Sequence, residues 1–149
     1  MLTSLIVITG MIKIPSPIPG AEFQLSAPIA VAIAVVFGFW RYIIAGILAS
    51  FIMFLTGLNT IINIEIAMIF RIVAGGIVAL FGNCIPVIVL AGPLGSAAAR
   101  LILSYTLHIN FWPLLIGAIP GMIFTMIFVL PLIKVLERVN KGVYHKYER

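Results

Sequence analysis

Three charged residues, Glu65, Arg71 and Arg100, lie inside long apolar segments of the sequence. A charged side chain at the centre of a bilayer costs about 2.5–3.5 kcal/mol on insertion scales, so each of them needs a compensating partner or a function. One interpretation is a structural ion pair, or a side chain that reaches the membrane surface. The other is a polar cavity inside a helical bundle, where guanidinium groups bind the carboxylate or phosphate of a small ligand.

The spacing of these residues favours one pairing. Glu65 and Arg71 are six positions apart, which is about 240° around a helix, so their side chains point in different directions. Glu65 and Arg100 lie at similar distances from the outer ends of their segments, and we expect a contact between them. Arg71 then has no acidic partner within the apolar segments, and we hypothesise that it faces an anion-binding cavity.

The composition excludes a soluble globular protein. The chain has 149 residues, of which 63% are hydrophobic and 9% charged, against roughly 25% charged residues in soluble domains. Seven of the 13 charged residues lie from Lys134 onward, so the preceding sequence cannot supply a polar surface. The net charge of +5 collects beside the last apolar segment, which is typical of a cytoplasmic membrane flank and not of a nucleic-acid-binding surface.

No catalytic or metal-binding motif is present in the sequence. His108 has no second His, Cys or acid at metal-ligand spacing, and Cys84 stands in an apolar context that predicts a small buried side chain. The Ser and Thr residues form no nucleophile motif, and phosphate-binding loops and dinucleotide fingerprints are missing. We therefore predict no metal, no cofactor and no enzymatic activity.

Gly, Pro, Asn and isolated charges divide the chain into six apolar segments. We predict an all-α integral membrane protein in which residues 1–134 form a compact bundle of six transmembrane helices and residues 135–149 form a basic cytoplasmic tail. The first segment is too short to cross a membrane alone, and the prolines after it predict a stiff, structured loop. The predicted segments are 2–14, 25–39, 42–58, 61–81, 85–107 and 112–134.

The lysines and arginines of the C-terminal tail predict that this end is cytoplasmic. Six crossings place the N-terminus on the same side of the plasma membrane, and the loops after the first, third and fifth segments then face outward. Trp40 and Trp112 fall at opposite predicted membrane interfaces, where indole rings are favoured.

Two local patterns bear on helix geometry. Pro93 follows Gly92 inside the fifth segment and predicts either a kink or a complete break; a break would create a helix start that attracts anions, whereas a kink is commoner. Small residues four positions apart predict close helix packing. They include the pairs Gly46 with Ser50, Gly92 with Ser96, Gly95 with Ala99, and Gly117 with Gly121.

The organisation of the chain resembles the S components of energy-coupling factor transporters. The local likeness lies in Ile14-Pro15, the run from Gly20 to Leu25, Ala27-Pro28, and the Ala/Val-rich segment that ends in Phe37-Gly38-Phe39. Many members of that family carry an Ala-x-x-x-Ala pattern in the first helix for docking to their partner, and the segment from Leu2 to Ile14 departs from this pattern.

The resemblance implies a membrane-embedded subunit that captures a small vitamin or micronutrient from outside. Its partners would be one transmembrane coupling subunit, two ATPase subunits that hydrolyse ATP, and the lipid bilayer around the chain itself. The ligand would be held near the outer surface by the first and third loops and the outer halves of helices four to six. With Arg71 added from the hypothesis above, the candidate binding residues are Glu22, Gln24, Asn59, Asn63, Glu65, Arg71, Arg100, His108, Asn110 and Trp112.

Two other functions remain open from the residues. A self-assembling channel or membrane scaffold would use the intramembrane charges to line a shared pore or to hold subunits together. A subunit of a larger membrane enzyme is a third interpretation. An S component differs from a channel in being monomeric alone and binding one ligand, whereas a channel forms a symmetric oligomer.

Overall fold

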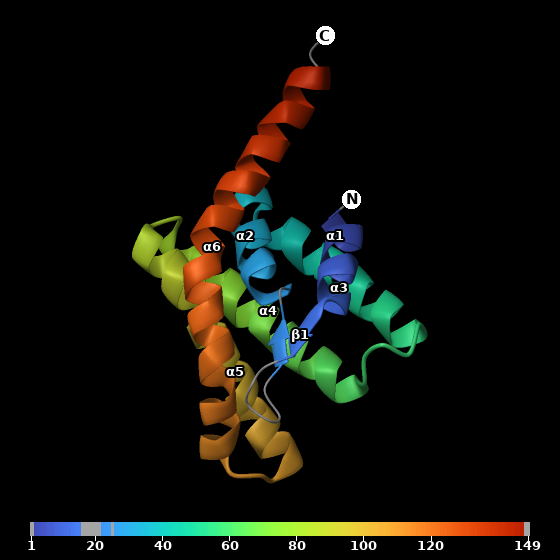
Figure 1. Cartoon of the computed structure of the whole chain (residues 1–149), viewed down its shortest axis with the longest axis vertical. Helices are drawn as coiled ribbons and strands as arrows, with labels where there is room; N and C mark the ends of the chain where they lie inside the picture. Colours follow the sequence, from blue (N-terminus) through green and yellow to red (C-terminus); the bar gives the residue numbers. More distant parts are fainter. Residues whose placement is uncertain (1, 16–21, 25, 148–149) are drawn as a thin grey trace.

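The computed structural model describes the backbone of residues 2–15, 22–24 and 26–147, and the side chains of residues 2–12 and 26–140. This part of the chain is a bundle of helices with one short antiparallel strand pair (Figure 1). The helices are α1 (Leu2–Met11), α2 (Ser26–Phe37), α3 (Phe39–Leu55), α4 (Ile61–Phe81), α5 (Ile85–Leu107) and α6 (Phe111–Tyr147).

The helical prediction is confirmed, and the six apolar segments correspond to the six helices in order. Three helices, α4, α5 and the Phe111–Asn140 part of α6, are long and apolar enough to cross a membrane. The apolar helices α1, α2 and α3 are shorter, with 10, 12 and 17 residues. Six separate crossings therefore stay a prediction.

The loop after α1 begins and ends in strands. β1 (Lys13–Pro15) pairs antiparallel with β2 (Glu22–Gln24), with Lys13 opposite Gln24. Prolines favour extended backbone in their neighbours, which suits the ends of a short hairpin. The rest of the predicted Pro-rich loop, residues 16–21, lies outside the described residues.

Glycines and caps set the turns between the helices. Gly38 (φ 87°) separates α2 from α3, and Gly82 (φ 81°) ends α4, because both positions need a positive φ that glycine adopts without strain. Thr60 caps α4 by accepting a hydrogen bond from the backbone N–H of Asn63 at 3.4 Å. Cys84 lies in the turn before α5 and is exposed, so the prediction of a buried side chain was wrong.

Two helices differ from the predicted segments. α5 runs unbroken through Pro93, so the alternative of a break with a new anion-binding helix start was wrong. α6 continues past residue 134 to Tyr147 and projects beyond the rest of the bundle (Figure 1). Charged residues end an apolar segment, but lysine, glutamate and arginine favour helix, so the basic segment is helical as far as Tyr147.

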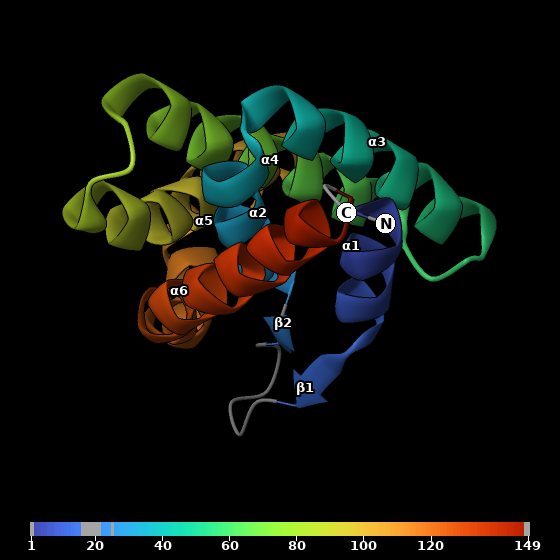
Figure 2. The same cartoon turned by 90° about the horizontal axis from the view of Figure 1, so that it is seen from above.

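α2 occupies the centre of the bundle and packs against each of the other five helices (Figure 2). Val31, Ala32 and Ile33 of α2 are fully buried. The outward faces carry large apolar side chains such as Trp40, Leu80 and Trp112, which are 74%, 83% and 69% exposed. An apolar surface of this extent needs lipid around it.

Small residues bring α5 close to its neighbours, as predicted. A Cβ added to Gly95 would lie 2.9 Å from the Cβ of Ala74 on α4. A Cβ added to Gly92 would collide with Cγ2 of Thr125 on α6. Close approach of this kind is what small residues provide in membrane bundles.

Candidate binding cavity

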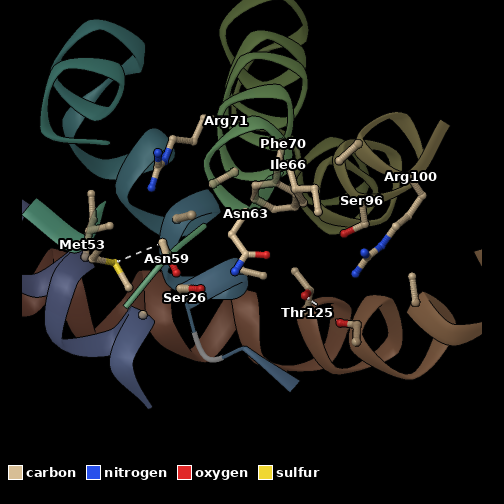
Figure 3. Close-up of a pocket in the computed structure, with 18 of the residues that line it drawn as sticks. Ser26, Met53, Asn59, Asn63, Ile66, Phe70, Arg71, Ser96, Arg100 and Thr125 are labelled. Atoms are coloured by element: carbon tan, nitrogen blue, oxygen red, sulfur yellow. Dashed lines mark hydrogen bonds between the residues drawn. The ribbon is translucent and has the colours of Figure 1, made fainter. Parts of the chain in front are cut away.

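A polar cavity of about 380 Å³ lies inside the bundle and is lined by all six helices (Figure 3). Its size falls in the range of small-molecule sites. The lining residues are Ile6, Gly10, Ser26, Ala27, Ala30, Tyr42, Met53, Asn59, Asn63, Ile66, Ala67, Phe70, Arg71, Ser96, Ala99, Arg100, Gly117, Ala118, Gly121 and Thr125.

Four predicted binding residues line this cavity: Asn59, Asn63, Arg71 and Arg100. Asn59 precedes α4, and its side-chain amide contacts the Met53 sulfur at 3.7 Å. Asn63 lies in the first turn of α4 and points into the cavity between the two arginines (Figure 3). The structure thus brings the two amides and Arg71, which lie close in the sequence, together with the more distant Arg100.

Arg71 is held firmly against α3. Its side chain is buried, with 7% exposure, and Nη1 donates hydrogen bonds to Ser50 Oγ at 2.6 Å and to the Met68 sulfur at 3.6 Å. The side chain crosses α3 at Gly46, where an added Cβ would lie 2.7 Å from Arg71 Cδ. In the predicted small pair, Gly46 leaves room for the Arg71 side chain and Ser50 accepts a hydrogen bond from its guanidinium group.

Arg100 lies at the opposite end of the cavity, near Ser96, and its guanidinium group points inward (Figure 3). Within residues 2–12 and 26–140, it has no hydrogen bond or ion pair with another side chain. Neither arginine has an acidic partner among these residues, so the cavity has unpaired positive charge at two ends.

Glu65 does not contact Arg100, so the predicted pair was wrong. Its Oε1 instead accepts a hydrogen bond from Thr106 Oγ1 on α5 at 2.8 Å. Glu65 does not line the cavity, although it lies on α4 between Asn63 and Arg71, which both do. Similar depth on two helices does not ensure that two side chains face each other.

Three further predicted residues lie away from the cavity. His108 adopts a left-handed conformation (φ 54°) and ends α5, with its ring 6.4 Å from that of Tyr105. Asn110 and Trp112 are exposed next to it in the turn into α6. None of the three is among the residues that line this cavity, and a role for them in binding stays a prediction.

Glu22 and Gln24 lie on β2, and their side chains are outside the described residues. No cluster of three or more metal-ligating side chains occurs among the described residues.

The sequence interpretation missed several lining residues, including Tyr42, Phe70 and Thr125. Each is an ordinary helix residue in an apolar segment, and no spacing distinguishes it. The pair Gly117 and Gly121 on α6 also lines the cavity, and an added Cβ at either position would meet nothing within 4 Å. There the small residues leave space instead of making a helix contact.

The apolar helices and the internal cavity lined by two arginines indicate a membrane protein with a polar binding cavity. No family model matches the chain, and no solved structure matches it. The chain is 57% identical over 143 residues to Protein BioX of Lysinibacillus sphaericus, covering 96% of this chain and 86% of that protein. The chain therefore belongs to the BioX family, and the resemblance to energy-coupling factor S components is confirmed.

Proposed function

We propose that this chain is the substrate-binding subunit of an energy-coupling factor importer and that it takes a carboxylate-bearing vitamin, biotin, into the six-helix cavity. The observation that carries this proposal is the pair of guanidinium groups of Arg71 and Arg100, which line one cavity without an acidic partner among the described residues. A buried cation without a counter-ion is costly, and a bound carboxylate compensates it. The relationship to BioX supports a vitamin as the ligand.

The remaining lining suits the rest of such a molecule. Ile66 and Phe70 provide apolar surface for a ring system and its aliphatic chain. Asn63, which lies between the two arginines (Figure 3), offers an amide donor and acceptor that match a ureido group. Biotin combines these three parts, a ureido ring system, an aliphatic chain and a carboxylate.

The proposed partners are one transmembrane coupling subunit and two ATPase subunits, with ATP hydrolysis in the latter. The proposed topology has six membrane segments and both termini in the cytoplasm, so the basic end of α6 faces the anionic inner leaflet. Because all six helices of one chain line the cavity, a second copy is not needed to complete it. This favours a monomeric binding subunit over a self-assembling channel.

The binding test uses the purified chain in lipid nanodiscs and labelled biotin. Arg71→Gln and Arg100→Gln each remove a charge that faces the cavity, and Arg41→Gln removes an exposed arginine from the start of α3 as the matched control. A hydrogen bond to a charged group contributes about 1.5–3 kcal/mol, so we expect each cavity variant to bind at least about tenfold more weakly. Unchanged affinity in both folded cavity variants would refute the proposed site.

The partner test is affinity purification of the tagged chain from its native membrane in mild detergent, followed by mass spectrometry. We expect one helical membrane protein and two ATPases. Recovery of the chain alone as a symmetric oligomer of fixed size, together with ion conductance in planar bilayers, would instead establish the channel alternative.

A further inference from the structure

Tyr42 is a buried polar residue whose hydroxyl has no hydrogen-bond partner among the described residues. The side chain is fully buried, and its hydroxyl makes no hydrogen bond with any described residue. Native structures satisfy the large majority of buried polar groups, so an orphaned hydroxyl needs an explanation. Here the explanation lies in its position, because Tyr42 lines the cavity.

The ring of Tyr42 is fixed by the helix that carries Arg71. A Cβ added to Gly75 on α4 would lie 3.2 Å from Cδ1 and Cε1 of the ring, and Gly75 is four residues after Arg71. Tyr42 and Arg71 therefore belong to the same end of the cavity. The hydroxyl cannot turn away to find another partner without disturbing the packing of α3 on α4.

Arg71 has free donors at this end. Its hydrogen bonds to Ser50 Oγ and to the Met68 sulfur both use Nη1. The opposite nitrogen, Nη2, and the phenol O–H are left to donate to a third group. The Tyr42 hydroxyl and the Arg71 guanidinium interact electrostatically. Two neighbouring donors without an acidic acceptor among the described residues are complementary to an oxygen acid.

We propose that Tyr42 is a ligand-binding residue, which donates its hydroxyl hydrogen to the carboxylate that Arg71 holds. This inference rests on the proposed function and deepens it, because it assigns the ends of the ligand. The carboxylate lies at the Tyr42 and Arg71 end, where the buried cation has the greater need of a counter-charge. The ureido carbonyl oxygen then lies at the Arg100 end and accepts a hydrogen bond from that guanidinium group.

The test compares Tyr42→Phe with Tyr105→Phe. The first removes only the orphaned hydroxyl, and the second removes a hydroxyl that is 81% exposed and outside the cavity. The measurements are the Kd for labelled biotin and the thermal unfolding midpoint, each in nanodiscs, with and without biotin. Tyr42→Phe is expected to raise the Kd about tenfold and to reduce the rise in midpoint that biotin causes. Tyr105→Phe is expected to change neither quantity.

The unliganded protein distinguishes a binding role from a structural one. Because the hydroxyl makes no hydrogen bond with a described residue, Tyr42→Phe is expected to leave the midpoint without biotin unchanged or higher. A lower midpoint without biotin would overturn the inference, since it would mean that the hydroxyl stabilises the fold. An unchanged Kd in Tyr42→Phe, with normal binding by the wild type, would also overturn it and leave the proposed function intact.

Failure of the proposed ligand has a different signature. If the wild-type chain does not bind biotin, the proposed function is wrong in its ligand, and the carboxylate assignment is overturned with it. The unliganded midpoints still decide whether the Tyr42 hydroxyl is an unpartnered group that faces the cavity.

Discussion

The side chain of Arg71 crosses α3 at Gly46, where a Cβ would lie 2.7 Å from both Cδ and Nε of the arginine. One turn later on the same helix, Ser50 accepts the hydrogen bond from Nη1. The absence of a side chain at residue 46 and the presence of a hydroxyl at residue 50 thus fix a cation beside the cavity. The small residues Gly46 and Ser50, four positions apart, predict helix packing, and here they position an arginine side chain.

Gly46→Ala is therefore expected to weaken ligand binding more than it weakens the fold. The added methyl group meets the flexible outer part of Arg71, which moves away from Ser50 and out of its binding position. We expect at least a tenfold increase in Kd for biotin, with a change of only a few degrees in the unfolding midpoint.

Gly76→Ala is the matched control for this substitution. Gly76 lies in α4, and an added Cβ would meet nothing within 4 Å. Because alanine favours helix over glycine, we expect normal binding and equal or greater stability. Equal loss of binding in both alanine variants would contradict the specific role of Gly46.

Glu65→Gln is expected to leave ligand binding within about twofold of wild type, an estimate for a residue that makes no cavity contact. The carboxylate is turned toward Thr106, and the amide oxygen of glutamine can accept the same hydrogen bond. Labelled-ligand binding by Glu65→Gln, side by side with Arg100→Gln, checks this expectation. A tenfold loss in Glu65→Gln would show that the acid acts on the cavity.

The helices were largely predictable because hydropathy and turn residues act locally. The ranges 61–81 and 85–107 agree residue for residue with α4 and α5. The predicted and observed helices differ where one residue type is compatible with two structures, such as a proline that can kink or break a helix. Pro93 is accommodated within a continuous α5, and the charged residues after Lys134 end the apolar segment without ending α6.

Of the residues that line the cavity, the two arginines and the two asparagines, Asn59 and Asn63, were predicted. Arg71 and Arg100 stand out because guanidinium groups are expensive in apolar segments, and both line the cavity. Their partners depend on how helices cross, which the spacing along one helix does not define. Tyr42 follows Arg41 near the start of α3, a position typical of an aromatic residue at a membrane interface, although it is fully buried.

The contact between Gly92 and Thr125 predicts a coupled pair of substitutions. Gly92→Ala places a methyl group against Cγ2 of Thr125 and is expected to destabilise the bundle by about 1–3 kcal/mol. Thr125→Ser removes Cγ2 and keeps the hydroxyl that bonds the carbonyl oxygen of Gly121 at 2.8 Å. The double variant should therefore recover part of the lost stability.

A double-mutant cycle of chemical or thermal unfolding measures this coupling. Additive effects of the two substitutions would mean that α5 and α6 separate easily at this position, contrary to the packing found here.

The positions of Arg71 and Arg100 also predict which small acids compete with the ligand. The two guanidinium groups lie at opposite ends of one cavity (Figure 3), so a straight-chain dicarboxylate can neutralise both, whereas a monocarboxylate of equal length neutralises one. We expect the dicarboxylate to inhibit labelled-biotin binding about tenfold more strongly when its length matches the cavity, because it gains a second charge-assisted contact. Inhibition constants for a series of both acids, measured on the wild type and on Arg100→Gln, check this expectation. In Arg100→Gln the advantage should disappear, and a dicarboxylate advantage that persists there would mean that the second carboxylate binds elsewhere.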